Sequence, residues 1–178
     1  EDETVFTIIQ SKNITQWEQI YQYTWRDKPL TEVVGKTLDL CREFKPDIVV
    51  IDDVGMGGGV TDRLSEQRHI PEAFIGNEKP ANELYENKRS EGFFRMKEFF
   101  EKGNIKIMND SLLMEQLLSL KYKFKSSGKK AVVSKDEMRR DNIRSPDRAD
   151  ALMMALYYTD RVFSERIRGN LPREALVD

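Results

Sequence analysis

A short apolar run that ends in two aspartates is the feature that most constrains this chain. Residues 47–51 (DIVVI) are apolar after the first position, and Asp52 and Asp53 follow directly. A continuous apolar run of this length is typical of a strand that is buried on both faces of a sheet. Burying a carboxylate at the end of such a strand costs free energy unless it is paired or bound to a metal. The two aspartates therefore indicate either a cation site or a cap of the following turn.

The elements around this run predict an α/β fold. Residues 4–10 and 14–25 have the pattern of two strands joined in a hairpin, and residues 33–44 have helical spacing that ends before Pro46. Beyond the aspartates, a helix over 60–66 followed by a strand over 73–75 predicts a parallel βαβ unit. We further expect a helix over 87–102, a strand over 105–108 and a helix over 111–120 capped by Asp110. A hairpin of 121–125 with 131–134, in which Gly128 supplies the turn, and a last helix with Ser145 as cap and Pro146 at its first position should follow. These elements predict a mixed sheet flanked by helices, with an added hairpin.

The length and composition predict one domain. The chain has 178 residues, of which 39% are hydrophobic, so we assign residues 1–178 to a single domain with a polar tail over 167–178. Cys41 is the only cysteine, which excludes a disulfide framework and a cysteine-based zinc site. No run of about 18 apolar residues is present, so we expect no membrane partner.

A second pair of carboxylates stands at the start of the last predicted helix. Asp147 and Asp150 are three positions apart, which places them on one face of the first helical turn. They indicate either a functional pair or ordinary stabilisation of a helix start by negative charge. The glycine-rich run 55–59 does not match a dinucleotide fingerprint, and no phosphate-binding loop motif occurs, so nucleotide binding is not supported. We expect these glycines to let the backbone turn tightly beside the aspartates.

The charge is distributed unevenly along the chain. The net charge is -2, but residues 121–144 contain nine basic and three acidic residues. Such a block indicates either a solvated face or a surface that binds DNA phosphates. Because aromatic residues are not clustered in this segment, we expect contacts to duplex phosphates rather than base stacking. The candidate DNA-binding residues are Lys121, Lys123, Lys125, Lys129, Lys130, Lys135, Arg139 and Arg140.

Four motifs in this order carry a family resemblance. They are residues 51–64 (IDDVGMGGGVTDRL), 85–89 (YENKR), 133–137 (VSKDE) and 145–152 (SPDRADAL). Together they resemble the carboxy-terminal nuclease domain of phage large terminases. The resemblance implies a ribonuclease-H-like sheet on which three acidic residues hold Mg²⁺ or Mn²⁺, with two ions expected.

The resemblance also implies roles for the four aspartates. Asp52 would be the metal ligand of the central strand, with Asp53 as the alternative one position later. Asp150 would be the ligand from the last helix, and Asp147 an accessory acid that ligates or supports. The family's first acid normally precedes a loop that resembles residues 1–4, so we expect the first catalytic acid upstream of Glu1 and give Asp2 only a peripheral role. We therefore expect feeble cleavage of DNA, or none, from a chain that starts at Glu1.

The implied function is that of an endonuclease which cuts concatemeric double-stranded viral DNA during genome packaging, by two-metal phosphodiester hydrolysis. The implied partners are double-stranded DNA and, through the full-length protein, the portal protein and the small terminase subunit. The implied location is the host cytoplasm, transiently at the procapsid portal. The alternatives are another ribonuclease-H-like nuclease, of the junction resolvase or transposase type, and a non-catalytic module that docks on DNA or the portal.

Overall fold

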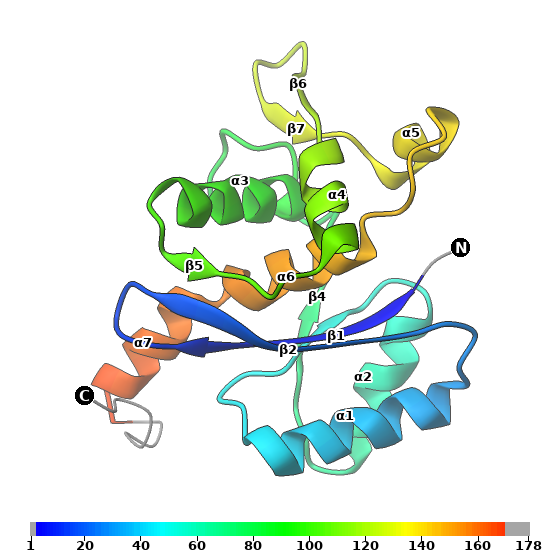
Figure 1. The fold of residues 1–178 in the computed structure, drawn as a ribbon, viewed down its shortest axis with the longest axis vertical. Helices are drawn as coiled ribbons and strands as arrows, with labels where there is room; N and C mark the ends of the chain where they lie inside the picture. Colours follow the sequence, from blue (N-terminus) through cyan, green and yellow to red (C-terminus); the bar gives the residue numbers. More distant parts are fainter. Residues whose placement is uncertain (1–2, 170–178) are drawn as a thin grey trace.

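Two long antiparallel strands cross the middle of the molecule (Figure 1). The computed structural model describes residues 3–169, apart from the side chains of Met56 and Arg166. Strand β1 (Thr4–Ser11) pairs with β2 (Trp17–Trp25), as the sequence predicts. β2 begins at Trp17, later than expected. The reason is that the side chain of Asn13 accepts hydrogen bonds from the backbone N–H groups of Thr15 and Gln16, which holds these residues in the turn.

A parallel βαβ unit follows helix α1 (Leu30–Phe44). Strand β3 (Val50–Asp52) pairs in parallel with β4 (Glu72–Phe74), and helix α2 (Met56–Glu66) joins them. The predicted βαβ unit is therefore confirmed.

Strand β3 is shorter and less buried than the sequence predicts. Val50 and Ile51 are only half-buried, so the prediction of a strand buried on both faces is wrong. The physical reason is that β3 pairs with β4 alone among the described strands, which leaves its other edge without a neighbour. The outer edge of β1 is likewise unpaired within the described residues.

Side-chain caps start the next two helices. Asn87 accepts a hydrogen bond from the backbone N–H of Ser90 at the start of α3 (Lys88–Glu101). Asp110, as predicted, caps α4 (Ser111–Ser119) by accepting from two backbone N–H groups. Between the two helices, the short strand β5 (Ile105–Lys106) pairs in parallel with β2, so the first sheet contains both kinds of pairing.

The predicted second hairpin is present. Strands β6 (Tyr122–Phe124) and β7 (Lys130–Val132) pair antiparallel, and Gly128 adopts a φ of 80° in the turn between them. A short helix that the sequence analysis missed, α5 (Lys135–Arg140), follows the hairpin. It begins with a capping box in which Ser134 and Glu137 bond reciprocally, a signal that the sequence does contain.

Two helices complete the described chain. Helix α6 (Asp147–Tyr157) begins at Asp147, and Ser145 does not cap it as predicted, because its hydroxyl donates to the Asp147 carboxylate instead. Helix α7 (Thr159–Ile167) then reaches the first residue of the predicted polar tail. Residues 170–178 of that tail lie outside the described residues, as does Asp2.

Helix α6 organises the main core. Ala149, Leu152, Met153 and Leu156 of this helix are fully buried against side chains from α3, α4, β2 and β4. Figure 1 shows α6 beside the β1–β2 pair, with α1 and α2 on one side of those strands and α3, α4 and the hairpin on the other. The hairpin lies at the end of the long axis opposite α1 (Figure 1). The fold is the expected mixed α/β class with sheets flanked by helices. Within the described range, no helix has the length and apolarity to span a membrane.

Candidate metal-binding carboxylate site

Asp52 lies at the carboxyl end of β3, where its carboxylate reaches solvent. One of its oxygens accepts a hydrogen bond of 3.3 Å from the backbone N–H of Val54. The pKa of Asp52 is raised, chiefly because neighbouring protein atoms displace part of the water around this exposed residue, and the charge of Asp150 adds to this effect. The positive charges of Lys135 and Arg89 act in the opposite direction. The structure therefore brings Asp52 within electrostatic range of the start of α6.

Asp53 is oriented differently from its neighbour. Its Oδ1 accepts a hydrogen bond of 2.6 Å from the Thr61 hydroxyl of α2. Adjacent residues of a strand point to opposite faces, so only one of the two aspartates can face α6. The structure gives Asp53 the role of tying the end of β3 to α2.

Asp150 is a buried carboxylate on the first turn of α6. Its side chain is 8% exposed, and Oδ1 accepts a hydrogen bond of 2.9 Å from Nε of Arg89 on α3. Oδ2 forms an ion pair with Lys135, whose ammonium nitrogen lies 3.1 Å away. No donor among the described residues has hydrogen-bond geometry to Oδ2. A buried carboxylate oxygen in this state is suited to a cation.

Asp147 is held by the protein on both of its oxygens. Oδ1 accepts from the Ser145 hydroxyl at 2.6 Å and from the Lys135 ammonium at 3.1 Å, and Oδ2 accepts from the backbone N–H of Glu3 at 2.9 Å. Burial raises the pKa of Asp147, but these hydrogen bonds and the charge of Lys135 outweigh it, so the net pKa is lowered. Its oxygens are thus already engaged, which suits a supporting acid better than a ligand.

Lys135 links the two aspartates of α6. It stands at the first position of α5, and its ammonium group lies between the carboxylates of Asp147 and Asp150. Burial acts to lower the pKa of Lys135, but the effect of the two aspartates is larger and opposite. The net pKa is raised, so the ammonium stays charged. Lys135 is one of the predicted DNA-binding residues, and its compensation of the two acids is a role that the charge pattern does not indicate.

Arg89, Glu3 and Arg148 are site residues that the sequence analysis did not single out. Arg89 also donates to the backbone carbonyl of Val133, which ties α3 to the segment after the hairpin. Arg148 forms ion pairs with Glu3 and with Asp110, the cap of α4. The available signals were a basic residue two positions after the Asn87 cap and another inside the 145–152 motif.

The described carboxylates fit part of a metal site. Asp52 and Asp150 supply two acids, and among the described residues the buried Oδ2 of Asp150 is neutralised only by the ammonium of Lys135. Over residues 3–169, no group of three histidine, cysteine, aspartate or glutamate side chains is arranged to hold a metal ion. A complete site of the expected kind therefore requires at least one more ligand.

The sequence matches the family model described as "Terminase RNaseH-like domain" over residues 1–159. The chain belongs to this family. None of the curated proteins with which the sequence was compared matches it.

Solved nuclease domains of phage large terminases share the fold of this terminase domain. The nuclease domain of the large terminase subunit gp2 of bacterial virus Sf6 superposes with a TM-score of 0.70 at 20% identity, over 78% of this chain and 77% of that one. The large terminase nuclease of thermophilic phage G20c with bound magnesium has a TM-score of 0.65 at 16% identity, over 90% and 75%. The nuclease domain of Thermus phage P74-26 has a TM-score of 0.54 at 14% identity, over 88% and 78%. At these identities the likeness concerns the fold.

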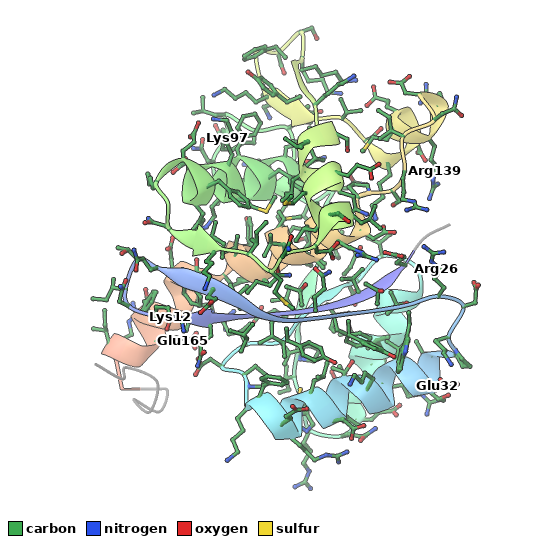
Figure 2. All side chains as sticks on the ribbon, viewed as in Figure 1. Lys12, Arg26, Glu32, Lys97, Arg139 and Glu165 are labelled. Atoms are coloured by element: carbon green, nitrogen blue, oxygen red, sulfur yellow. The ribbon has the colours of Figure 1, made fainter. Side chains whose placement is uncertain are left out.

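The predicted DNA-binding residues of the terminase domain lie in three settings. Lys135 points into the acids, as described above. Lys123 and Lys125 pair with Glu137 and Glu86, the latter at 4.0 Å. Lys121, Lys129 and Lys130 of the hairpin have no ion-pair partner among residues 3–169. Arg139 and Arg140 lie on α5, where Arg139 is at the outer edge of the molecule (Figure 2).

The expectation that aromatic residues are not clustered at the basic segment is wrong. Tyr122 and Phe124 of β6 continue a series of ring contacts that starts at Tyr85 and passes through Phe94 of α3. Two of these rings come from outside residues 121–144, so the chain pattern alone did not reveal the cluster.

Proposed function

We propose that this terminase domain is a divalent-metal-dependent endonuclease that cuts double-stranded viral DNA during genome packaging. The observation that carries the proposal is the approach of Asp52 on β3 to Asp150 on α6, with a buried Asp150 oxygen that lacks an aligned donor. Related domains add support, since a mutant Sf6 nuclease domain contains manganese and the G20c nuclease contains magnesium or cobalt.

Asp52 and Asp150 would hold the metal, and we expect two ions. Such ions, when bound, lower the pKa of a water molecule and stabilise the leaving oxygen of a phosphodiester. Arg89 would orient Asp150 through its 2.9 Å hydrogen bond, and Asp147 would keep Lys135 beside the site. Asp53 would serve the fold through Thr61.

We further propose that a third carboxylate comes from a strand upstream of Glu1. β1 and β3 each have an edge that is unpaired within the described residues, and an added strand could supply the missing backbone partners. Parallel strands that end at the same edge of a sheet bring their terminal side chains together. A carboxylate at the end of such a strand would join Asp52 and Asp150.

The proposed setting follows from the family. The substrate would be concatemeric duplex DNA, and the portal protein and small terminase subunit would act through the full-length protein. The place of action would be the host cytoplasm, at the procapsid portal.

Plasmid cleavage tests the proposal. The protein extended upstream through the added strand should nick and linearise supercoiled plasmid with Mn²⁺ or Mg²⁺, and chelator should abolish this activity. Asp150→Asn should reduce cleavage by orders of magnitude, whereas Asp53→Asn should retain it. Metal-dependent cleavage confined to branched DNA would favour a junction resolvase. Duplex binding without cleavage of any DNA form would favour the docking module.

A further inference from the structure

Four aromatic side chains form a continuous row on the hairpin side of the molecule. The aromatic row consists of Tyr85, Phe94 of α3, and Tyr122 and Phe124 of β6. Successive ring centroids are 5.2, 5.2 and 5.9 Å apart. These separations are typical of aromatic packing in a protein core.

This row ends on the surface, not in the core. Tyr122 is 54% exposed and Phe124 is 64% exposed, whereas Phe94 and Tyr85 beneath them are half-buried. Tyr122 and Phe124 are two positions apart in a strand, so their side chains stand on the same face of β6. Large exposed rings supported by a second layer of rings indicate a binding surface, because water contact with apolar area is unfavourable.

One lysine of the hairpin lies over the row. The ammonium of Lys130 lies 5.3 Å from the centroid of the Phe94 ring. Lys121 and Lys129, at either end of the hairpin strands, have no ion-pair partner within the described chain. Lys97 lies on the hairpin side of α3 (Figure 2), where it forms an ion pair with Glu101. By the alternation of the strands, Lys121 and Lys129 project to the opposite face of the hairpin, whereas Lys130 shares the face of the rings. The surface thus combines exposed rings with one lysine, Lys130, that has no ion-pair partner among the described residues.

The hairpin is anchored to the carboxylate site. The backbone N–H of Val132 donates to the Ser90 hydroxyl at 3.1 Å, and Arg89 donates to the carbonyl of Val133 while also binding Asp150. The strand that borders the row therefore continues directly into the residues that orient the acids.

We propose that the aromatic row binds unpaired nucleotides of DNA, with bases stacked on Tyr122 and Phe124 and a neighbouring phosphate held by Lys130, the cross-strand partner of Phe124. Unpaired bases offer their faces to aromatic rings, whereas paired bases inside a duplex offer only their edges. The positive charge of Lys130 matches the negative backbone of a DNA strand. The choice of DNA rests on the proposed nuclease function, but binding of single strands goes beyond it.

Binding measurements without metal test this inference separately from cleavage. Fluorescence anisotropy with a labelled thymidine oligonucleotide of about 12 nucleotides, in chelator, reports binding when no cleavage can occur. Phe124→Leu and Tyr122→Leu keep apolar volume but remove the ring, and each should weaken binding about fivefold or more. Phe124→Tyr should bind as the wild type does. Phe100→Leu is the matched control, because Phe100 is a 38% exposed ring of α3 outside the row.

Three results would overturn the inference. The first is an oligonucleotide affinity that both leucine variants leave unchanged while Lys129→Ala weakens it, since charge alone would then explain binding. The second is an equal loss of affinity for a duplex of the same length. The third is no binding of the oligonucleotide by the wild-type protein, and plasmid cleavage would then still report on the nuclease proposal independently.

Discussion

Lys135 places its ammonium nitrogen 3.1 Å from Oδ2 of Asp150, a buried oxygen that lacks an aligned hydrogen bond from the described residues. The positive charge of the lysine compensates a carboxylate that would otherwise be costly to bury. A divalent cation would make the same compensation, so lysine and metal have overlapping electrostatic roles at this carboxylate.

The first prediction follows from this overlap. Lys135→Met removes the charge and keeps most of the side-chain volume, so unfolding free energy at neutral pH should fall by about 1–3 kcal/mol. Mn²⁺ should then raise the melting temperature of the variant more than that of the wild type, because it restores the lost charge. Thermal melts with and without Mn²⁺ measure both effects. Equal shifts in the two proteins would contradict the overlap.

Asp52 and Asp53 are expected to respond oppositely to the same change. The pKa of Asp52 is raised, mainly by burial, so its ionisation opposes folding, and that cost appears as the pH rises through the raised pKa. Asp52→Asn should therefore stabilise the metal-free protein at neutral pH and abolish stabilisation by Mn²⁺. Asp53→Asn should weaken the bond to Thr61, lower stability and leave the Mn²⁺ effect intact. Melting temperatures across pH 4 to 8 would reveal an exchange of roles if the two outcomes were reversed.

Two adjacent glycines of α2 form a matched pair for the end of β3. A Cβ atom on Gly57 would lie 1.5 Å from the backbone oxygen of Asp52, whereas one on Gly58 would lie 3.9 Å from that of Asp53. Gly57→Ala must displace the Asp52 backbone, so we expect a loss of about 1–3 kcal/mol or more and of metal-dependent stabilisation. Gly58→Ala meets only ordinary contact and should stabilise the helix by about 0.5–1 kcal/mol. Denaturant unfolding of both variants checks the difference, and equal destabilisation would argue against the close approach at Gly57.

The Arg148 ion pairs should make stability depend on acid. Its hydrogen bond lowers the pKa of Glu3, and the pKa of Asp110 is lowered because a backbone donor and Arg148 outweigh burial. A carboxylate with a lowered pKa stabilises the fold at pH values above its ordinary pKa, which is 4.5 for Glu3 and 3.8 for Asp110. This contribution is lost as the pH falls through the pKa of the folded state. Arg148→Met should thus cost about 2–4 kcal/mol at pH 7 and much less at pH 3.

Urea unfolding at both pH values measures this difference. Arg161→Met is the control, since Arg161 pairs with Glu72 at the surface and its side chain is 48% exposed. The control should cost less than about 1 kcal/mol. A deficit for Arg148→Met that is the same at pH 3 as at pH 7 would show that lost packing, not charge, is the cause.

Lysines of the hairpin should control the salt dependence of duplex binding. Lys129→Ala and Lys130→Ala should flatten the slope of log affinity against log salt by about one unit per lost phosphate contact, with little dependence on base sequence. Lys135→Ala should change the slope less, because its ammonium is engaged by two carboxylates. Titrations at several salt concentrations test this, and unchanged slopes in all three variants would return the hairpin lysines to a solvated face.

Local chemistry made much of the fold predictable. The Asp110 cap, the Gly128 turn and the alternating strands around residue 12 each act through neighbours in the chain, and the structure has them where expected. Helix α5 escaped prediction although Ser134 and Glu137 form a recognisable capping box. The buried state of β3 was overestimated because burial depends on which strands lie beside it.

The sequence by itself determined that carboxylates end a strand and begin a helix, because apolar runs, helix caps and turn residues act over a few positions. Only the tertiary structure decided that Asp52 faces α6 while Asp53 binds Thr61, since neighbouring strand residues point to opposite faces and the pattern does not say which face is which. It also decided that Lys135 compensates Asp150 and that four rings from three segments meet beside the hairpin. Such relationships join residues that are distant in the chain, and packing of whole elements sets them.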